Sequence, residues 1–194
     1  MNTEKPLSIG TRRELFVDHE WIDSLGDCRL VMHRPRCEGK VLDYDEPWEG
    51  VHSGHETVMK LDDGFRLYYR GAGNVQDGDT SVCTCMARSA DGKVWTKPDI
   101  GQFKIGGSKR NNTVLAHDGP FSQSFGPFFD TRPDVPDSER FKAVGGTYHT
   151  GGLFAFGSED GIHWQKLKDS PILTHPEFAF DSPNRRSGPS PKGP

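Results

Sequence analysis

Cysteine and histidine side chains stand at short spacings in two places along the sequence. Cys83 and Cys85 are two positions apart in VCTCMA, and His52 and His55 form H-x-x-H. Residues two apart in a strand share one face, so the cysteines are predicted to be small buried apolar side chains. A zinc site would need further ligands at suitable spacing, and two histidines in a loop or strand fix no metal geometry. We therefore expect neither a metal site nor a cofactor.

One seven-residue motif, S-x-D-G-x-x-W, occurs twice. SADGKVW begins at Ser89, and SEDGIHW begins at Ser158, 69 positions later. An aspartate could act as an acid or a base, and a tryptophan could stack on a sugar. The favoured interpretation is structural, because Asp-Gly supplies the positive φ of a tight turn and Ser and Asp side chains accept hydrogen bonds from turn N–H groups. Trp95 and Trp164 would then cover the seam between neighbouring sheets.

Short β-rich runs precede each copy of the motif. Residues 57–71 (TVMKLDDGFRLYYRG) hold two runs around Asp63-Gly64, a strong hairpin signal, and FKAV takes the place of FRLYY in the second copy. A third run leads into each turn, and a fourth carries the tryptophan. Four short antiparallel strands per repeat predict an all-β fold built from β-propeller blades.

Composition supports a turn-rich β protein and argues against two classes of partner. The 194 residues include 23 glycines and 14 prolines, and 32% are hydrophobic. A net charge of −4 with interleaved signs predicts binding to neither nucleic acid nor an anionic membrane. The N-terminus has no apolar signal-peptide core, so a cytoplasmic protein is expected, or an exported one if the start is mis-assigned.

A set of short segments spread over most of residues 12–184 forms a recognisable pattern. The segments are LFVDHEWID (15–23), RLVMHRP (29–35), FRLYYRG (65–71), SADGKVWTKPDIG (89–101), NNTVL (111–115), PFFDTRP (127–133), ERFKAVGG (139–146), SEDGIHW and FAFDSPN (178–184). As a set they resemble the five-bladed propeller glycosidases of glycoside hydrolase families 32 and 43. The likeness is closer still to bacterial proteins named for the family 32 N-terminal domain.

The resemblance implies an incomplete propeller, with two four-stranded blades and the start of a third out of five. The expected parts are a flexible N-terminus (1–11), an extension (12–50), blade one (51–115), blade two (120–175), the start of blade three (176–184) and a disordered tail (185–194). We expect either a truncated product or a short self-assembling module. In both cases, oligomerisation through exposed blade edges is predicted.

The resemblance also implies where catalytic carboxylates would stand, since such glycosidases aim carboxylates from inner strands into a central channel. Glu56, Asp130 and Asp181 take these positions, and a pair of carboxylates can protonate a leaving oxygen and attack or activate water. Each departs from the pattern or has an alternative. Glu56 stands where the glycosidases have Asp-Pro, Asp130 could cap a turn or pair with Arg132, and Asp181 is followed two positions on by Pro183 in place of Gln.

Four further side chains could bind a carbohydrate. Arg70 and Arg132 offer forked donors to a sugar hydroxyl or carboxylate, with an ion pair between blades as the alternative. Trp48 could stack on a sugar, and His55 could bond a hydroxyl, with ordinary packing as the alternative for both.

The expected function is therefore that of a glycoside hydrolase-like fragment with a carbohydrate ligand. Two alternatives stay open: a non-catalytic carbohydrate-binding propeller and an inactive remnant. No residue matches the expected proton donor, so the sequence does not separate them.

Overall fold

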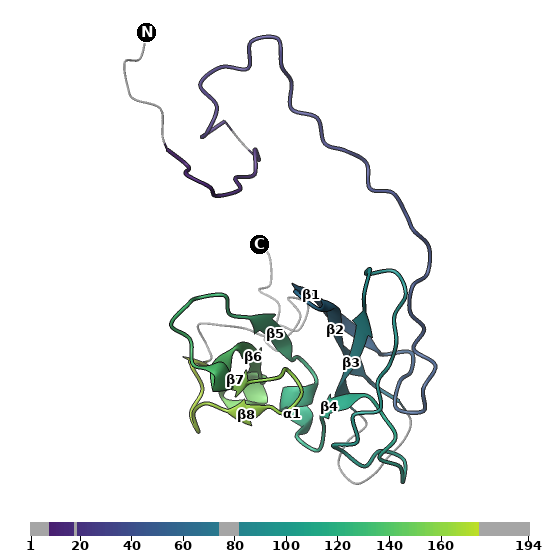
Figure 1. Ribbon diagram of the computed structural model, residues 1–194. Helices are drawn as coiled ribbons and strands as arrows, with labels where there is room; N and C mark the ends of the chain where they lie inside the picture. The colour runs from purple at the N-terminus through teal and green to yellow at the C-terminus, as the bar shows by residue number, and fades with distance from the viewer. Residues whose placement is uncertain (1–7, 18, 74–81, 175–194) are drawn as a thin grey trace, which may run out of the picture. The chain divides into compact units, whose positions relative to one another are not determined.

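The computed structural model describes residues 8–17, 19–73 and 82–174, and the chain divides into two units at Glu38. In the first unit, the described residues form turns and extended chain, with neither a helix nor a strand. All strands of the described chain lie in the second unit, where they form two antiparallel sheets (Figure 1). The predicted third-blade start and tail lie outside the described residues.

The first sheet is a meander of four strands in the order β1-β2-β3-β4. They are β1 (Gly54–Leu61), β2 (Gly64–Gly71), β3 (Cys83–Ser89) and β4 (Thr113–Leu115). The predicted hairpin at Asp63-Gly64 is confirmed, because Leu61 pairs with Gly64 across a two-residue turn.

The second sheet repeats this order with β5-β6-β7-β8 and adds one strand against β7. Its strands are β5 (Gly126–Phe129), β6 (Phe141–Gly145), β7 (Gly152–Ser158), β8 (Gln165–Lys166) and β9 (Leu173–Thr174). FKAV forms β6, as its correspondence with FRLYY predicts. Two consecutive four-stranded meanders are the arrangement of propeller blades, so the predicted fold class is confirmed.

Helical structure is confined to single turns in the described residues. These are α1 (Gly119–Ser122) and the 3₁₀ turns η1 (Asp137–Glu139) and η2 (Tyr148–Thr150). None of the described helices has the length and apolar composition needed to cross a membrane.

One strand assignment from the sequence is wrong. The sequence predicts that the run carrying Trp95 is the fourth strand of the first sheet, yet this run contributes only an isolated bridge between Thr96 and Arg88. The fourth strand is β4, which begins within Asn111-Asn112-Thr113. Both asparagines are buried there, because β3 pairs with a segment more than twenty positions further along the chain.

The turn of the second repeat is held by its own side chains, as predicted. Ser158 Oγ accepts from Gly161 N at 2.9 Å, and Asp160 Oδ1 accepts from the N–H groups of Ile162 and His163 at 2.8 and 2.9 Å. Gly161 takes a φ of 71°. Two side chains therefore satisfy three backbone donors that the sheet leaves unpaired.

The turn of the first repeat has the same hydrogen bonds. Ser89 Oγ accepts from Gly92 N at 2.8 Å, while Asp91 Oδ1 accepts from the N–H groups of Lys93 and Val94 at 2.8 and 2.9 Å. Gly92 takes a φ of 75°. The repeated sequence therefore specifies a repeated turn.

The second turn also binds the first sheet. Tyr68 of β2 is fully buried, and its hydroxyl donates to the Gly161 carbonyl at 2.9 Å. Trp164 packs edge-on against Tyr68, with ring centroids 6.2 Å apart, and against Phe125, just before β5 of the second sheet, at 5.0 Å. The predicted seam position of Trp164 is confirmed.

Arg66 reinforces the same junction. Its Nη1 donates to the Asp160 carbonyl, and its guanidinium lies over the Phe141 ring, 4.8 Å from the centroid. Planar guanidinium groups combine both contacts because their donors lie in the plane and their faces are weakly hydrated. β2 thus holds the second turn through two side chains.

The two tryptophans differ in their indole hydrogen bonds. Trp95 Nε1 donates to the Gly92 carbonyl at 3.1 Å, and the ring packs on the core of the first sheet. In the second repeat, the equivalent Gly161 carbonyl accepts from Tyr68, and the buried Trp164 Nε1 has no hydrogen-bond partner within residues 8–17, 19–73 and 82–174. The second turn therefore lacks the indole-to-carbonyl hydrogen bond of the first turn, and its glycine carbonyl instead accepts a hydrogen bond from the first sheet.

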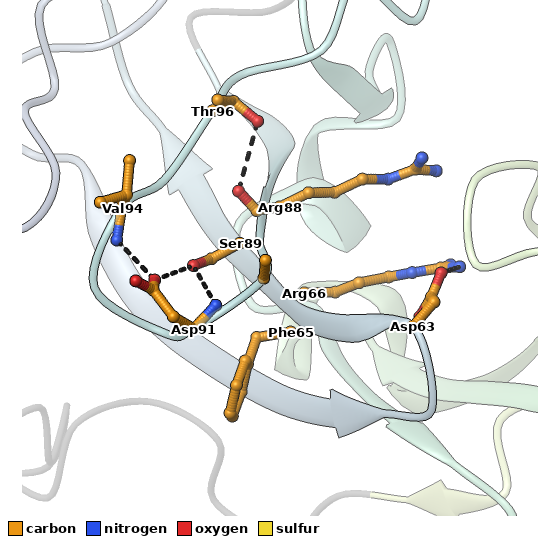
Figure 2. Close-up of a pocket in the computed structure, with 9 residues that line it drawn as sticks. Asp63, Phe65, Arg66, Arg88, Ser89, Asp91, Val94 and Thr96 are labelled. Carbon is orange, nitrogen blue, oxygen red and sulfur yellow. Dashed lines mark hydrogen bonds and ion pairs between the residues drawn. The ribbon is translucent and has the colours of Figure 1, made fainter.

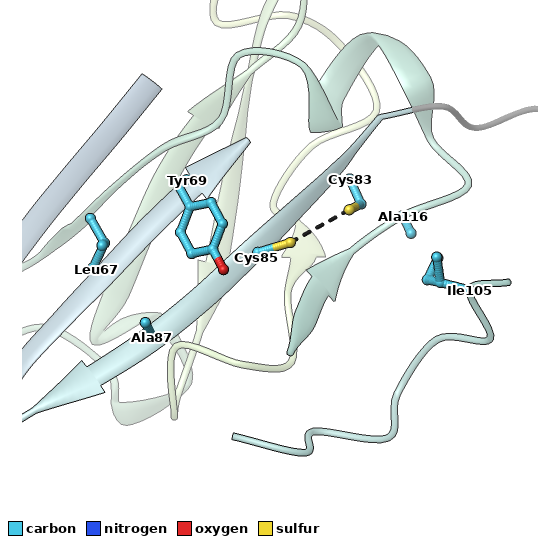
Figure 3. Close-up of a cluster of buried hydrophobic side chains, with 7 residues drawn as sticks. All are labelled: Leu67, Tyr69, Cys83, Cys85, Ala87, Ile105 and Ala116. Carbon is cyan, nitrogen blue, oxygen red and sulfur yellow. Dashed lines mark hydrogen bonds between the residues drawn. The ribbon is translucent and has the colours of Figure 1, made fainter. Parts of the chain in front are cut away.

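Cys83 and Cys85 are buried on one side of β3, as predicted, and both are free thiols (Figure 3). Their Sγ atoms lie 3.5 Å apart within a cluster that includes Leu67 and Tyr69. They fill the space as small apolar side chains do.

Gly161→Ala is predicted to destabilise the protein more than Gly92→Ala. Both changes strain a left-handed backbone and are expected to cost about 1 kcal/mol or more. At Gly161 the added Cβ would also lie 2.5 Å from the Tyr68 hydroxyl, whereas at Gly92 its nearest contact is 3.7 Å away. We expect a total loss of about 2–4 kcal/mol for Gly161→Ala in urea unfolding. Equal losses for the two variants would contradict the docking of the second turn on β2.

Candidate functional site

Glu56 is an exposed carboxylate near the start of β1, the edge strand of the first sheet. The Tyr44 hydroxyl donates to its Oε1, and this hydrogen bond is the main cause of a lowered pKa for Glu56. Burial, followed by the same contact, raises the pKa of Tyr44. The Tyr44 ring in turn packs against Tyr69, with centroids 5.0 Å apart. Glu56 is therefore an ionised, oriented carboxylate open to solvent.

The backbone around Glu56 is irregular. The pairing of β1 with β2 shifts register between Gly54 and Thr57, and His55 takes a φ of 58°, a left-handed conformation uncommon for residues with a side chain. Such irregularities re-aim side chains at the ends of sheets. His55 and Glu56, both predicted site residues, thus project from a bulged edge.

Arg70, predicted to bind substrate, lies beside this edge, and its guanidinium donates hydrogen bonds to a backbone carbonyl. Its Nε and Nη2 donate to the His52 carbonyl at 2.8 and 2.5 Å, and its strand position pairs with Gly54. The guanidinium therefore holds the loop that precedes β1.

Asp130, immediately after β5, is buried and surrounded by cations. Arg132 donates to both of its oxygens, at 3.1 and 2.8 Å, and Lys142 Nζ donates to Oδ2 at 3.0 Å. The backbone N–H of Arg132 also donates to Oδ1 at 3.2 Å. The hydrogen bonds from Arg132, more than any other contact, keep the pKa of Asp130 well below its usual range. Asp130 therefore caps the turn and pairs with Arg132, which is the structural alternative to a catalytic role.

Glu56 and Asp130 occupy non-equivalent positions of the two sheets. β2 and β6 begin their matching runs at Phe65 and Phe141. Glu56 stands four positions before the β1 partner of Phe65, whereas Asp130 directly follows the β5 partner of Phe141. The two carboxylates therefore stand near opposite ends of the corresponding strands β1 and β5, and no hydrogen bond or ion pair between described residues joins them directly.

The remaining predicted site residues either have structural partners of their own, with no hydrogen bond or ion pair to Glu56 among the described residues, or lie outside the described chain. Asp181 falls outside the described residues. Arg132 belongs to the Asp130 ion pair. Trp48 packs on the core of the first sheet, and its Nε1 donates to Asn112 Oδ1 at 2.9 Å.

Sequence reasoning missed a buried polar network beneath Trp48. Glu49 is buried, accepts a hydrogen bond from the Tyr69 hydroxyl and forms an ion pair with Lys97 at 2.7 Å. Asn112, also buried, donates to the Tyr69 hydroxyl at 2.7 Å. Nothing in DYDEPWE distinguishes Glu49 from its acidic neighbours, because only the packing of the loop against β2 and β3 decides which carboxylate is enclosed.

The described residues contain no group of three or more His, Cys, Asp or Glu side chains arranged to hold a metal ion. Cys83 and Cys85 provide two sulfur atoms in an apolar cluster, without further ligands of this kind. The chemistry of the described site is that of a carboxylate, a histidine and a phenol.

Comparisons with solved structures find proteins of similar fold, two of which are glycoside hydrolase-related. No protein-family model matches the sequence, and no curated protein matches it. One structure is a glycosyl hydrolase from Bacteroides ovatus, with 16% identity and a TM-score of 0.41. The other belongs to work on the GH130 family of mannoside phosphorylases, which contains glycoside hydrolases that target β-1,2-mannosidic linkages in Candida mannan; it shows 14% identity and a TM-score of 0.41. Each match covers 68% of this chain and 36% of the other, so the chain spans about a third of either neighbour.

Asp130→Asn is predicted to lower the free energy of unfolding at neutral pH. Because the folded-state pKa of Asp130 lies below its ordinary value of about 4, the ion pairs contribute fully above that pH and are lost as the pH falls toward the folded-state pKa. The stability difference between wild type and variant should therefore be constant from pH 7 to 5 and shrink below pH 4 in urea titrations.

Asp137→Asn is the matched control, because that carboxylate is exposed and its ion pair with Arg140 is 3.5 Å long. It should change stability little at any pH. A wild-type advantage over Asp130→Asn that persists undiminished to pH 2.5 would contradict the assignment.

Proposed function

We propose that this chain is a sector of a carbohydrate-active propeller protein, and that Glu56 is the carboxylate it contributes to glycosidic-bond cleavage. The observation that carries the proposal is the environment of Glu56, which is solvent-open, on a bulged edge strand and ionised through the Tyr44 hydrogen bond. The two blade-like sheets support the scaffold part of the proposal.

The lowered pKa assigns Glu56 the role of base or nucleophile. A general acid must hold its proton near neutral pH, which a carboxylate with a depressed pKa does not do. Asp130 is unsuited to the acid role for the same reason, and its oxygens are taken by Arg132 and Lys142. The acid would come from elsewhere in the complete site, because no residue of this sequence matches the expected proton donor.

A non-catalytic carbohydrate-binding propeller is the second candidate. The observation that favours it is the saturation of Asp130, which leaves Glu56 as the accessible member of the two described candidate carboxylates. His55 beside Glu56, together with the loop held by Arg70, would then form part of a binding surface for sugar hydroxyls.

The test is hydrolysis of a panel of chromogenic glycosides and oligosaccharides, run alongside a glycan array. Glu56→Gln should lower kcat by roughly 10²–10⁴-fold, because it removes the base while keeping the shape of the side chain. Asp62→Asn, an exposed carboxylate at the turn end of the same strand, is the matched control and should leave kcat unchanged.

Tyr44→Phe provides a second readout. Loss of its hydroxyl should let the pKa of Glu56 rise, so the acidic limb of the kcat/KM profile should move to higher pH. Glycan binding without cleavage would favour the second candidate. Neither binding nor cleavage, or full activity in Glu56→Gln, would refute the role of Glu56.

A further inference from the structure

A pocket of about 400 Å³ lies at the turn of the first repeat, and it contains no residue of the Glu56 site. It is formed by the start of β2, the end of β3 and the segment that leads to Thr96 (Figure 2). The side chains that matter most to its chemistry are Asp63, Phe65, Arg66, Arg88, Asp91 and Thr96.

Two arginines stand side by side in this pocket. Arg66 of β2 and Arg88 of β3 are direct partners in the sheet register, and Figure 2 shows both side chains extending in the same direction. Like charges directly opposite in an antiparallel pair are unfavourable. The arrangement therefore needs a negative charge beside it or imposes a cost on the sheet.

Arg66 is already neutralised by the protein. Its Nη2 lies 3.8 Å from Asp63 Oδ2, and its Nη1 donates to the Asp160 carbonyl. Its guanidinium also covers the Phe141 ring. Arg66 is therefore fixed in place at the junction of the two sheets and is not free to turn toward a ligand.

Asp91, the second acidic residue of the pocket, accepts hydrogen bonds from its own turn. Asp91 Oδ1 accepts from the N–H groups of Lys93 and Val94 and from the hydroxyl of Ser89. This carboxylate oxygen is committed to the turn, and no ion pair links Asp91 to an arginine of the pocket.

Arg88 is left without a counter-charge among the described residues. It is exposed, and no ion pair or side-chain hydrogen bond joins its guanidinium to another described residue. Its backbone, by contrast, is fixed by two hydrogen bonds with Thr96, at 2.9 and 2.8 Å. A rigidly rooted arginine with free donors thus lines a pocket in which Arg66 is already paired with Asp63 and Asp91 is hydrogen-bonded to its own turn.

We propose that this pocket binds a small ligand through an oxyanion group, a carboxylate or a sulfate, held by the forked donors of Arg88 beside Arg66. A guanidinium donates two parallel N–H bonds to such a group. Phe65 and Val94 contribute apolar side chains to the pocket lining, and the Thr96 hydroxyl donates to the Arg88 carbonyl at 3.3 Å. This site does not depend on the proposed role of Glu56.

Calorimetric titration of the full chain tests the proposal with sodium sulfate, sodium glucuronate and neutral glucose, at constant ionic strength set with sodium chloride. We expect saturable binding of an oxyanion and none of glucose. Tighter binding of glucuronate than of sulfate would identify an acidic sugar as the ligand class, and the reverse order would identify a free tetrahedral anion; both outcomes support the oxyanion site.

Arg88→Gln should weaken that binding by roughly tenfold or more, and Arg88→Lys should restore part of it, because lysine keeps the charge without the fork. Arg110→Gln is the matched control, since Arg110 is exposed, pairs with Asp99 and lies outside the pocket. Both positions are exposed, so the variants should fold like wild type. No saturable oxyanion binding, equal binding of glucose, or an Arg88→Gln affinity equal to that of Arg110→Gln would overturn the proposal.

Discussion

The hydroxyl of Tyr68 is enclosed between two sheets, where an unpaired hydroxyl would be costly. It finds its acceptor in the Gly161 carbonyl, which belongs to the turn that closes β7 of the other sheet. Ser158 and Asp160 hold this turn in shape by accepting from its N–H groups. Its carbonyl accepts from Tyr68, whereas the Gly92 carbonyl of the first turn accepts from its own tryptophan. The relative placement of the two blade-like sheets therefore depends on a turn built from its own side chains and docked on its neighbour.

The same dependence explains why similar residues have different roles in the two repeats. The first turn keeps its Gly92 carbonyl for Trp95 and borders an open pocket, whereas the second turn is closed over by Tyr68 and Arg66. Carboxylates are divided in the same way. Glu56, on an exposed edge beside one phenol, keeps an open face, but Asp130, between Arg132 and Lys142, is a structural charge. Environment, and not residue type, decides which group can do chemistry.

Local patterns carried most of what the sequence could predict. The hairpin at Asp63-Gly64, the strand FKAV and both S-x-D-G-x-x-W turns depend on contacts within a few positions, and the structure has all of them. Strand β4 and the buried carboxylate of Glu49 depend on partners far along the chain, so no local pattern marks them. Asp130 falls between these cases: its neighbour Arg132 is visible in the sequence, but Lys142 reaches it only through the pairing of β5 with β6.

The docking of the second turn on β2 is tested most directly by a double-mutant cycle that combines Tyr68→Phe with Asp160→Ala in urea unfolding. Asp160 orders the turn that presents the acceptor, so the two changes should be coupled by at least about 0.5 kcal/mol. The parallel cycle with Asp91→Ala, which loosens the first turn instead, should be additive within about 0.3–0.5 kcal/mol. Additivity in both cycles would contradict the account, because the contribution of the Tyr68 hydroxyl to stability would then not depend on the second turn.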